Sequence, residues 1–193
     1  MATTPNHIIV IGGSSGSLPI IKEILDRLQK PFTCTIAIVV HRLRNVHSDL
    51  SKVFVQKKTF KLHEPEDKEL IVRGNVYLAP ANYHLLFEGK ESFCLDYSEP
   101  IWYSRPSIDV TFSSAAHAFG KNTLAILLTG ANADGAEGCH TVLKNGGTVL
   151  VQNPEESAFD AMPKAAIERN KNCIVCSVEE IIEKTQSFIN KIP

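Results

Sequence analysis

Short apolar runs alternate with amphipathic stretches along almost the whole chain. Residues 8–11 and 34–40 are unbroken runs rich in Ile, Val and Ala, which is typical of strands buried on both faces. Residues 18–28 between them carry apolar side chains at helical spacing. Strand–helix alternation of this kind predicts an α/β fold, a doubly wound and mostly parallel sheet in a three-layer, Rossmann-like arrangement. Further strands are expected over 124–128, 148–152 and 173–176, and further helices over 48–55, 107–119, 135–144, 162–169 and 178–189.

The middle of the chain has a different pattern. Short strand-like pieces are expected over 60–62, 75–78, 84–87 and 93–95, with Gly89 in a tight connection between the last two. This pattern predicts an antiparallel insert with a β-hairpin. A chain of 193 residues is the size of one such domain, so we expect a single domain over 1–193.

Composition excludes several classes of function. The formal net charge is −1 and no basic stretch is interleaved with aromatic residues, so a nucleic-acid partner is not expected. No apolar run approaches the roughly 20 residues of a membrane span, and the first residues lack the pattern of a secretory signal. We therefore expect a cytoplasmic protein without membrane insertion.

Cysteine usage gives no metal site. Five cysteines at irregular spacing make a poor disulfide framework, and reduced thiols are expected. Cys173 and Cys176 form a C-x-x-C, which can be a redox pair or half of a metal site. Without a second such pair or a nearby histidine, two small residues of a strand are the favoured interpretation.

Three polar patches follow three of the expected strands. Ser14 lies in the Gly-Ser segment 12–17, His41 follows the second strand, and Asp134 lies in the turn after the strand over 124–128. The carboxyl ends of parallel strands line the binding crevice of an open sheet. Ser, His and Asp delivered there are the components of a hydrolase triad.

Each of these patches also has a simpler explanation. A Gly-rich turn after the first strand most often binds phosphate, although Gly12, Gly13 and Gly16 do not fit G-x-G-x-x-G. His41 can be a packed structural residue, and Asp134 can be a helix N-cap. A triad gives all three a role: Ser14 on a sharp strand-to-helix turn as nucleophile, His41 as base, and Asp134 as the residue that orients the imidazole.

Several motifs together resemble one family, the catalytic domain of CheB-type chemotaxis protein-glutamate methylesterases. The resemblance covers about His7 to Asn190. Its motifs are I-G-G-S-S-G at 11–16, His41, Y-L-A-P at 77–80 with His84, S-R-P-S-I-D at 104–109, L-L-T-G at 127–130 with Asp134-Gly135, Gln152-Asn153, and A-M-P at 161–163. The departures from the family pattern are Ser17, Arg42-Leu43, Ala131, Asn132 and Ala161.

The resemblance implies a serine hydrolase that removes methyl groups from glutamate γ-methyl esters on the cytoplasmic helices of chemotaxis receptors. It implies methanol as product, glutamine deamidation as a second activity, and no metal or organic cofactor. Ser14, His41 and Asp134 would be catalytic, with oxyanion or substrate-binding positions at Ser15, Ala131 and Gly13. We expect a monomeric, stand-alone enzyme without a receiver domain.

Two other classes of function stay open. One is a CheB-like binding or regulatory module with weak or no catalysis, and the other is a nucleotide-binding Rossmann-like protein. A fluorophosphonate probe distinguishes the first from an esterase, and nucleotide-dependent thermal stabilisation would favour the second. A further hypothesis is that Arg42, Arg44, Lys57 and Lys58 steer an acidic substrate, with ordinary solvated charges as the alternative.

Overall fold

A central parallel sheet organises the computed structural model, which describes residues 4–29, 31–42 and 60–192. The strand order is β3-β4-β2-β1-β7-β8-β9, and every pairing in this sheet is parallel. The order reverses direction beside β1, as a doubly wound fold requires. The strands are β1 (Ile8–Gly13), β2 (Thr35–Val40), β3 (Leu62–His63), β4 (Val76–Leu78), β7 (Thr123–Leu127), β8 (Thr148–Gln152) and β9 (Ile174–Cys176).

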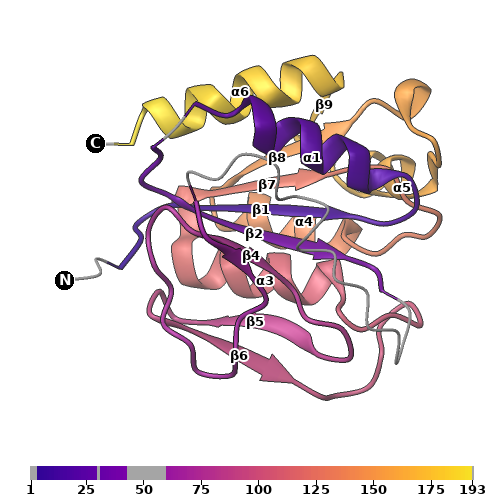
Figure 1. Cartoon of the computed structure of the whole chain (residues 1–193). Helices are drawn as coiled ribbons and strands as arrows, with labels where there is room; N and C mark the ends of the chain where they lie inside the picture. Colours follow the sequence, from indigo (N-terminus) through magenta and orange to yellow (C-terminus); the bar gives the residue numbers. More distant parts are fainter. Residues whose placement is uncertain (1–3, 30, 43–59, 193) are drawn as a thin grey trace.

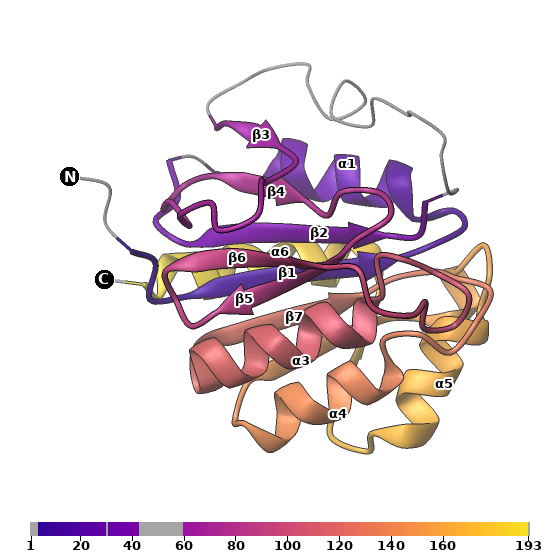
Figure 2. The same ribbon diagram turned by 90° about the horizontal axis from the view of Figure 1, so that it is seen from below.

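Helices cover both faces of this sheet, which confirms the three-layer prediction (Figures 1 and 2). One face carries α1 (Ser17–Arg27) and α6 (Val178–Asn190), and the other carries α3 (Ile108–Phe119), α4 (Ala136–Lys144) and α5 (Ala161–Arg169). Because successive strand side chains point to opposite faces, β1 contributes to two separate cores. Ile9 and Ile11 pack in the core of α1 and α6, whereas Val10 packs in the core of α3 and α4.

The antiparallel part is smaller than the sequence pattern predicts. Among the described residues, β5 (His84–Glu88) and β6 (Ser92–Asp96) are the only strands that form an antiparallel hairpin, whose Phe87 packs edge-on against Phe119 of α3 at 5.7 Å between ring centroids. The strands β3 and β4, expected in the insert, instead extend the main sheet in parallel. All three residues of β4 are buried, so this short strand suits an interior position beside β2.

The remaining expected elements agree with the structure to within one or two residues, and β1 is the strand that extends beyond its expected end. It continues through Gly13, where its register pairs Gly13 with Val40, the last residue of β2. The helix expected over 48–55 lies outside the described residues. Short 3-10 turns occur at Gly120–Asn122 and Pro154–Glu156. None of the helices described is long and apolar enough to cross a membrane.

Candidate active site

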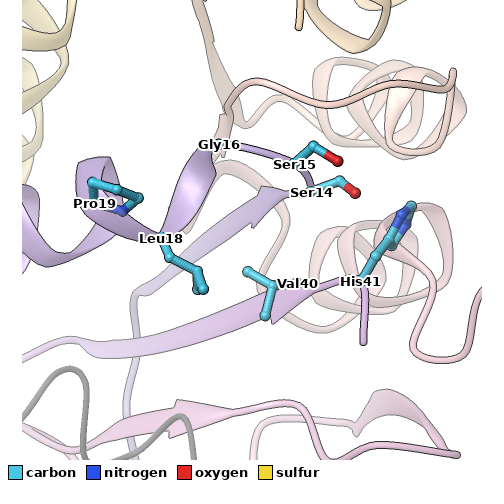
Figure 3. Close-up of a pocket in the computed structure, with 7 residues that line it drawn as sticks. All are labelled: Ser14, Ser15, Gly16, Leu18, Pro19, Val40 and His41. Atoms are coloured by element: carbon cyan, nitrogen blue, oxygen red, sulfur yellow. The ribbon is translucent and has the colours of Figure 1, made fainter. Parts of the chain in front are cut away.

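The turn after β1 and the end of β2 lie side by side at the carboxyl edge of the sheet. Because Gly13 pairs with Val40, Ser14 and His41 leave the sheet next to each other, and His41 N donates to Gly13 O at 3.4 Å. Figure 3 shows the Ser14 and Ser15 hydroxyls and the His41 imidazole together at this edge. The sequence prediction that Ser14 and His41 are neighbours is therefore confirmed.

The turn that carries Ser14 is held by hydrogen bonds on both sides. Ser14 N donates to Thr129 O at 2.9 Å, and Ser14 O accepts from Ser17 N at 3.1 Å and from Ser17 Oγ at 2.7 Å. Gly16 caps α1 with a φ of 82°, and a Cβ there would lie 2.9 Å from Cβ of Ala158. A residue without a side chain is needed at this position, so the sharp turn depends on Gly16.

The imidazole of His41 contacts the carboxylate of Asp134 directly. Their Nε2 and Oδ2 atoms lie 2.8 Å apart, with the His41 side chain 14% exposed and that of Asp134 fully buried. Because an ionised carboxylate only accepts hydrogen bonds, Nε2 carries the proton. Nδ1 has no hydrogen-bond partner among the described residues, so it is the nitrogen left to accept a proton.

Asp134 is bound at the N-terminus of α3. Its Oδ1 accepts from Ser107 Oγ at 2.9 Å and from Asp109 N at 3.0 Å, and its Oδ2 accepts from Ile108 N at 2.8 Å. Burial alone would raise the pKa of this carboxyl, but the bonds from His41 and the backbone outweigh it and lower the pKa. Asp134 is thus an anion at neutral pH, and it caps α3 rather than the helix that follows it.

Asp109 is a second carboxylate beside Asp134, and the sequence motifs assign it no role. Its Oδ1 accepts from Gly135 N at 2.9 Å and from Gly138 N at 2.7 Å. Burial, together with the charge of Asp134, raises its pKa to about 6 despite these two bonds. The available sequence signal was its place three residues after Pro106, in the first turn of α3.

Backbone N–H groups suited to an oxyanion occur on the loops after β1 and β7. Neither Ser15 N nor Ala131 N has a hydrogen-bond acceptor in the described part of the chain. Thr129 Oγ1 lies 3.0 Å from Ser15 O, which keeps these two loops together. Gly13 differs from them, because it is buried as the last residue of β1. These positions are compatible with the expected oxyanion roles of Ser15 and Ala131.

A cavity of about 330 Å³ opens in front of Ser14 (Figure 3). Leu18 and Val40 provide apolar side chains beside the two serine hydroxyls and the imidazole. The described residues that line it are Ser14, Ser15, Gly16, Leu18, Pro19, Val40 and His41. This mixture suits a short aliphatic chain that carries a polar reacting group.

The described residues provide no metal-binding cluster at this edge, and Arg42, the one candidate steering cation among them, is paired. In residues 4–29, 31–42 and 60–192, no cluster of three or more His, Cys, Asp or Glu side chains could hold a metal ion, and all five cysteines are free. Arg42 forms an ion pair with Glu64 and its side chain is only 5% exposed, so it is not a solvated steering charge. Arg44, Lys57 and Lys58 lie outside the described residues.

Comparisons with known proteins show which family this chain is similar to. The model of the CheB methylesterase family matches residues 9–185. A Leptospira interrogans protein, provisionally named protein-glutamate methylesterase/protein-glutamine glutaminase, is 39% identical over 91% of this chain and 91% of its own length. The chain is 34% identical to a Thermotoga maritima protein of the same name, over 92% of this chain and 52% of that protein.

A solved structure shows the same fold. The crystal structure of the Thermotoga maritima CheB methylesterase catalytic domain superposes with a TM-score of 0.83 at 32% identity, covering 95% of this chain and 98% of that one. The family model spans far more than half of the chain, and the matched region includes all three strand ends described above. The chain therefore belongs to the CheB methylesterase family.

Proposed function

We propose that this chain is a serine hydrolase that removes methyl groups from glutamate γ-methyl esters on the cytoplasmic helices of chemotaxis receptors. The single observation that carries the proposal is the 2.8 Å contact between His41 and the buried Asp134, at the sheet edge where Ser14 follows β1. Family membership and the names of the relatives support the substrate class. Ser14 is the nucleophile, His41 the general base and Asp134 the residue that orients the imidazole.

The two ring nitrogens of His41 have separate tasks in this mechanism. Nε2–H is bound to Asp134, so Nδ1 accepts the proton of Ser14 Oγ as that oxygen attacks the ester carbonyl. This assignment reverses the nitrogen roles of the usual serine-protease arrangement. The buried carboxylate of Asp134 then stabilises the imidazolium that forms.

The tetrahedral intermediate carries its negative charge toward Ser15 N and Ala131 N, whose N–H groups are available for it. As the intermediate collapses, the C–O bond to the methoxy group breaks and the proton on His41 Nδ1 passes to the leaving oxygen, which releases methanol. His41 next takes a proton from water, which attacks the acyl-serine. The ester bond to Ser14 breaks as His41 Nδ1 returns its proton to Ser14 Oγ, and the products are a glutamate carboxylate and free Ser14. The same steps on a glutamine side chain release ammonia, so we propose deamidation as a second activity.

Methanol release from a methylated receptor fragment tests the proposal. Ser14→Ala should reduce kcat by about 10⁴-fold or more and abolish labelling by a fluorophosphonate. Ser92→Ala is the matched control, because the hydroxyl of Ser92 bonds to Glu88 on the hairpin of β5 and β6, away from the cavity in front of Ser14. If Ser14→Ala keeps its rate and its labelling, the nucleophile assignment is wrong. A folded wild-type protein that neither reacts nor labels would favour a binding module instead.

A further inference from the structure

Each of the helices α3 and α4 binds, at its N-terminus, a carboxylate that lies at the start of the other helix. The N-terminus of α3 binds Asp134, which lies just before α4, through Ser107 Oγ and two backbone N–H groups. In return, the N-terminus of α4 binds Asp109, which lies in the first turn of α3, through Gly135 N and Gly138 N. Helix N-termini favour anions, so each helix stabilises the carboxylate supplied by the other.

Close packing of the two helices holds these reciprocal contacts in place. A Cβ at Gly138 would lie 2.7 Å from Cβ of Phe112 and 3.0 Å from Cα of Asp109, so the two helices meet at backbone distance there. Asp134 directly precedes Gly135, the N-cap of α4. A shift of the start of α4 would therefore move the Asp134 backbone, and with it the carboxylate that contacts His41.

We propose that Asp109 is a positioning residue for the esterase reaction, one that fixes the Asp134 carboxylate against His41 by tying the start of α4 to the start of α3. This inference rests on the proposed function, since it assumes that the His41–Asp134 pair acts in catalysis. Asp109 itself does not touch the cavity in front of Ser14. It lines a separate cavity of about 460 Å³ together with Trp102, Ala133 and Ala136.

The contact between Asp109 and the start of α4 does not depend on the charge of Asp109. Glu137 on the first turn of α4 is engaged by Arg169 of α5 at 2.9 Å. The ionisable groups packed around Asp109 are Asp134, Glu137, Cys139, Glu168 and Arg169. Protonated Asp109 keeps an acceptor oxygen for Gly135 N and Gly138 N, so the connection survives titration of this carboxyl.

Substitutions at Asp109 separate this role from a general effect on folding. Asp109→Ala removes the acceptor for both N–H groups, and we expect kcat to fall 10- to 100-fold with KM within about twofold, as for a small displacement of a catalytic group. Asp109→Asn keeps an acceptor oxygen and should restore kcat to within about threefold of wild type. Glu137→Ala is the matched control, because Glu137 is an exposed carboxylate on the first turn of α4, the turn that Asp109 contacts, and this variant should leave kcat unchanged.

The His41–Asp134 hydrogen bond gives a readout that does not depend on activity. In the wild type, the Nε2 proton of His41 should give a downfield NMR resonance. Asp109→Ala should lose or shift this resonance, and Asp109→Asn should keep it. If Asp109→Ala does not fold, Asp109→Glu replaces it, because the longer side chain keeps the charge but displaces the acceptor. Wild-type kcat and resonance in the folded Asp109→Ala or Asp109→Glu protein would overturn the proposal.

The two readouts also separate this inference from the proposed function. Loss of the resonance in Asp109→Ala, in a protein whose wild type releases no methanol, would show that Asp109 holds Asp134 against His41 but would refute the esterase reaction that this placement is proposed to serve. Methanol release by the wild type, with an unchanged resonance and kcat in Asp109→Ala, would support the esterase and refute the positioning role of Asp109.

Discussion

Replacing Asp134 with asparagine perturbs the candidate active site with almost no change in shape. The carboxylate accepts four hydrogen bonds, two at each oxygen. An amide keeps one acceptor oxygen, which can still serve Ser107 Oγ and Asp109 N. Its NH₂ group then faces Ile108 N–H and His41 Nε2–H, where two donors oppose it.

The cost follows from these contacts. Ile108 is fully buried, and a buried N–H left without an acceptor costs about 1–3 kcal/mol. The loss of a negative charge at the N-terminus of α3 adds up to ~1 kcal/mol. We therefore expect Asp134→Asn to lower the free energy of unfolding by roughly 2–4 kcal/mol at pH 7. His41 can relieve its own conflict by moving its proton to Nδ1, but that tautomer cannot deprotonate Ser14, so kcat should fall by about 10⁴-fold.

The stability difference should depend on pH with a defined sign. The pKa of Asp134 is lower in the folded protein than its ordinary value, so its stabilisation is present above about pH 4 and is lost as the pH falls through the folded pKa. The difference between wild type and Asp134→Asn should be largest at neutral pH and should narrow in acid. Urea unfolding at several pH values measures it, with Glu137→Gln as an exposed carboxylate-to-amide control. Unfolding energies within about 0.5 kcal/mol at pH 7, or a kcat within tenfold, would refute the reasoning.

Three further variants test other parts of the structure. Trp102 and Tyr103 both have positive φ, 49° and 60°, so replacing them with Asn-Gly should raise the free energy of unfolding by about 1–2 kcal/mol, and an unchanged or lower melting temperature would contradict this. Ser177→Ala removes the capping box of α6 and should cost about 1 kcal/mol in urea unfolding, whereas no loss would mean that the cap contributes nothing. Gly16→Ala should cost about 1–2 kcal/mol and slow fluorophosphonate labelling of Ser14, so a labelling rate equal to wild type would show that the turn tolerates a side chain.

Local pattern in the sequence determines most of the fold and part of the candidate site. The buried runs and the amphipathic stretches specify a parallel sheet with helices on both faces, because each element must bury its apolar side against another layer. In such a sheet the residues after each strand converge on one edge. The sequence alone thus predicts that Ser14 and His41 lie together and that Asp134 approaches them.

Tertiary packing determines the strand pairing and the side-chain contacts that the local sequence pattern does not specify. The sequence of the short strand β4 is equally suited to parallel and antiparallel pairing. Its burial beside β2 places it in the main parallel sheet. From its sequence position, Arg42 is expected to be a solvated surface charge, but the fold places Glu64 in contact with it. The packing of α3 against α4 determines that His41 faces Asp134 with Nε2. It also determines the reciprocal contacts of Asp134 and Asp109 with the two helix starts. These groups lie 25 or more residues apart in the chain, so only the folded arrangement of the helices determines which donor each carboxylate receives.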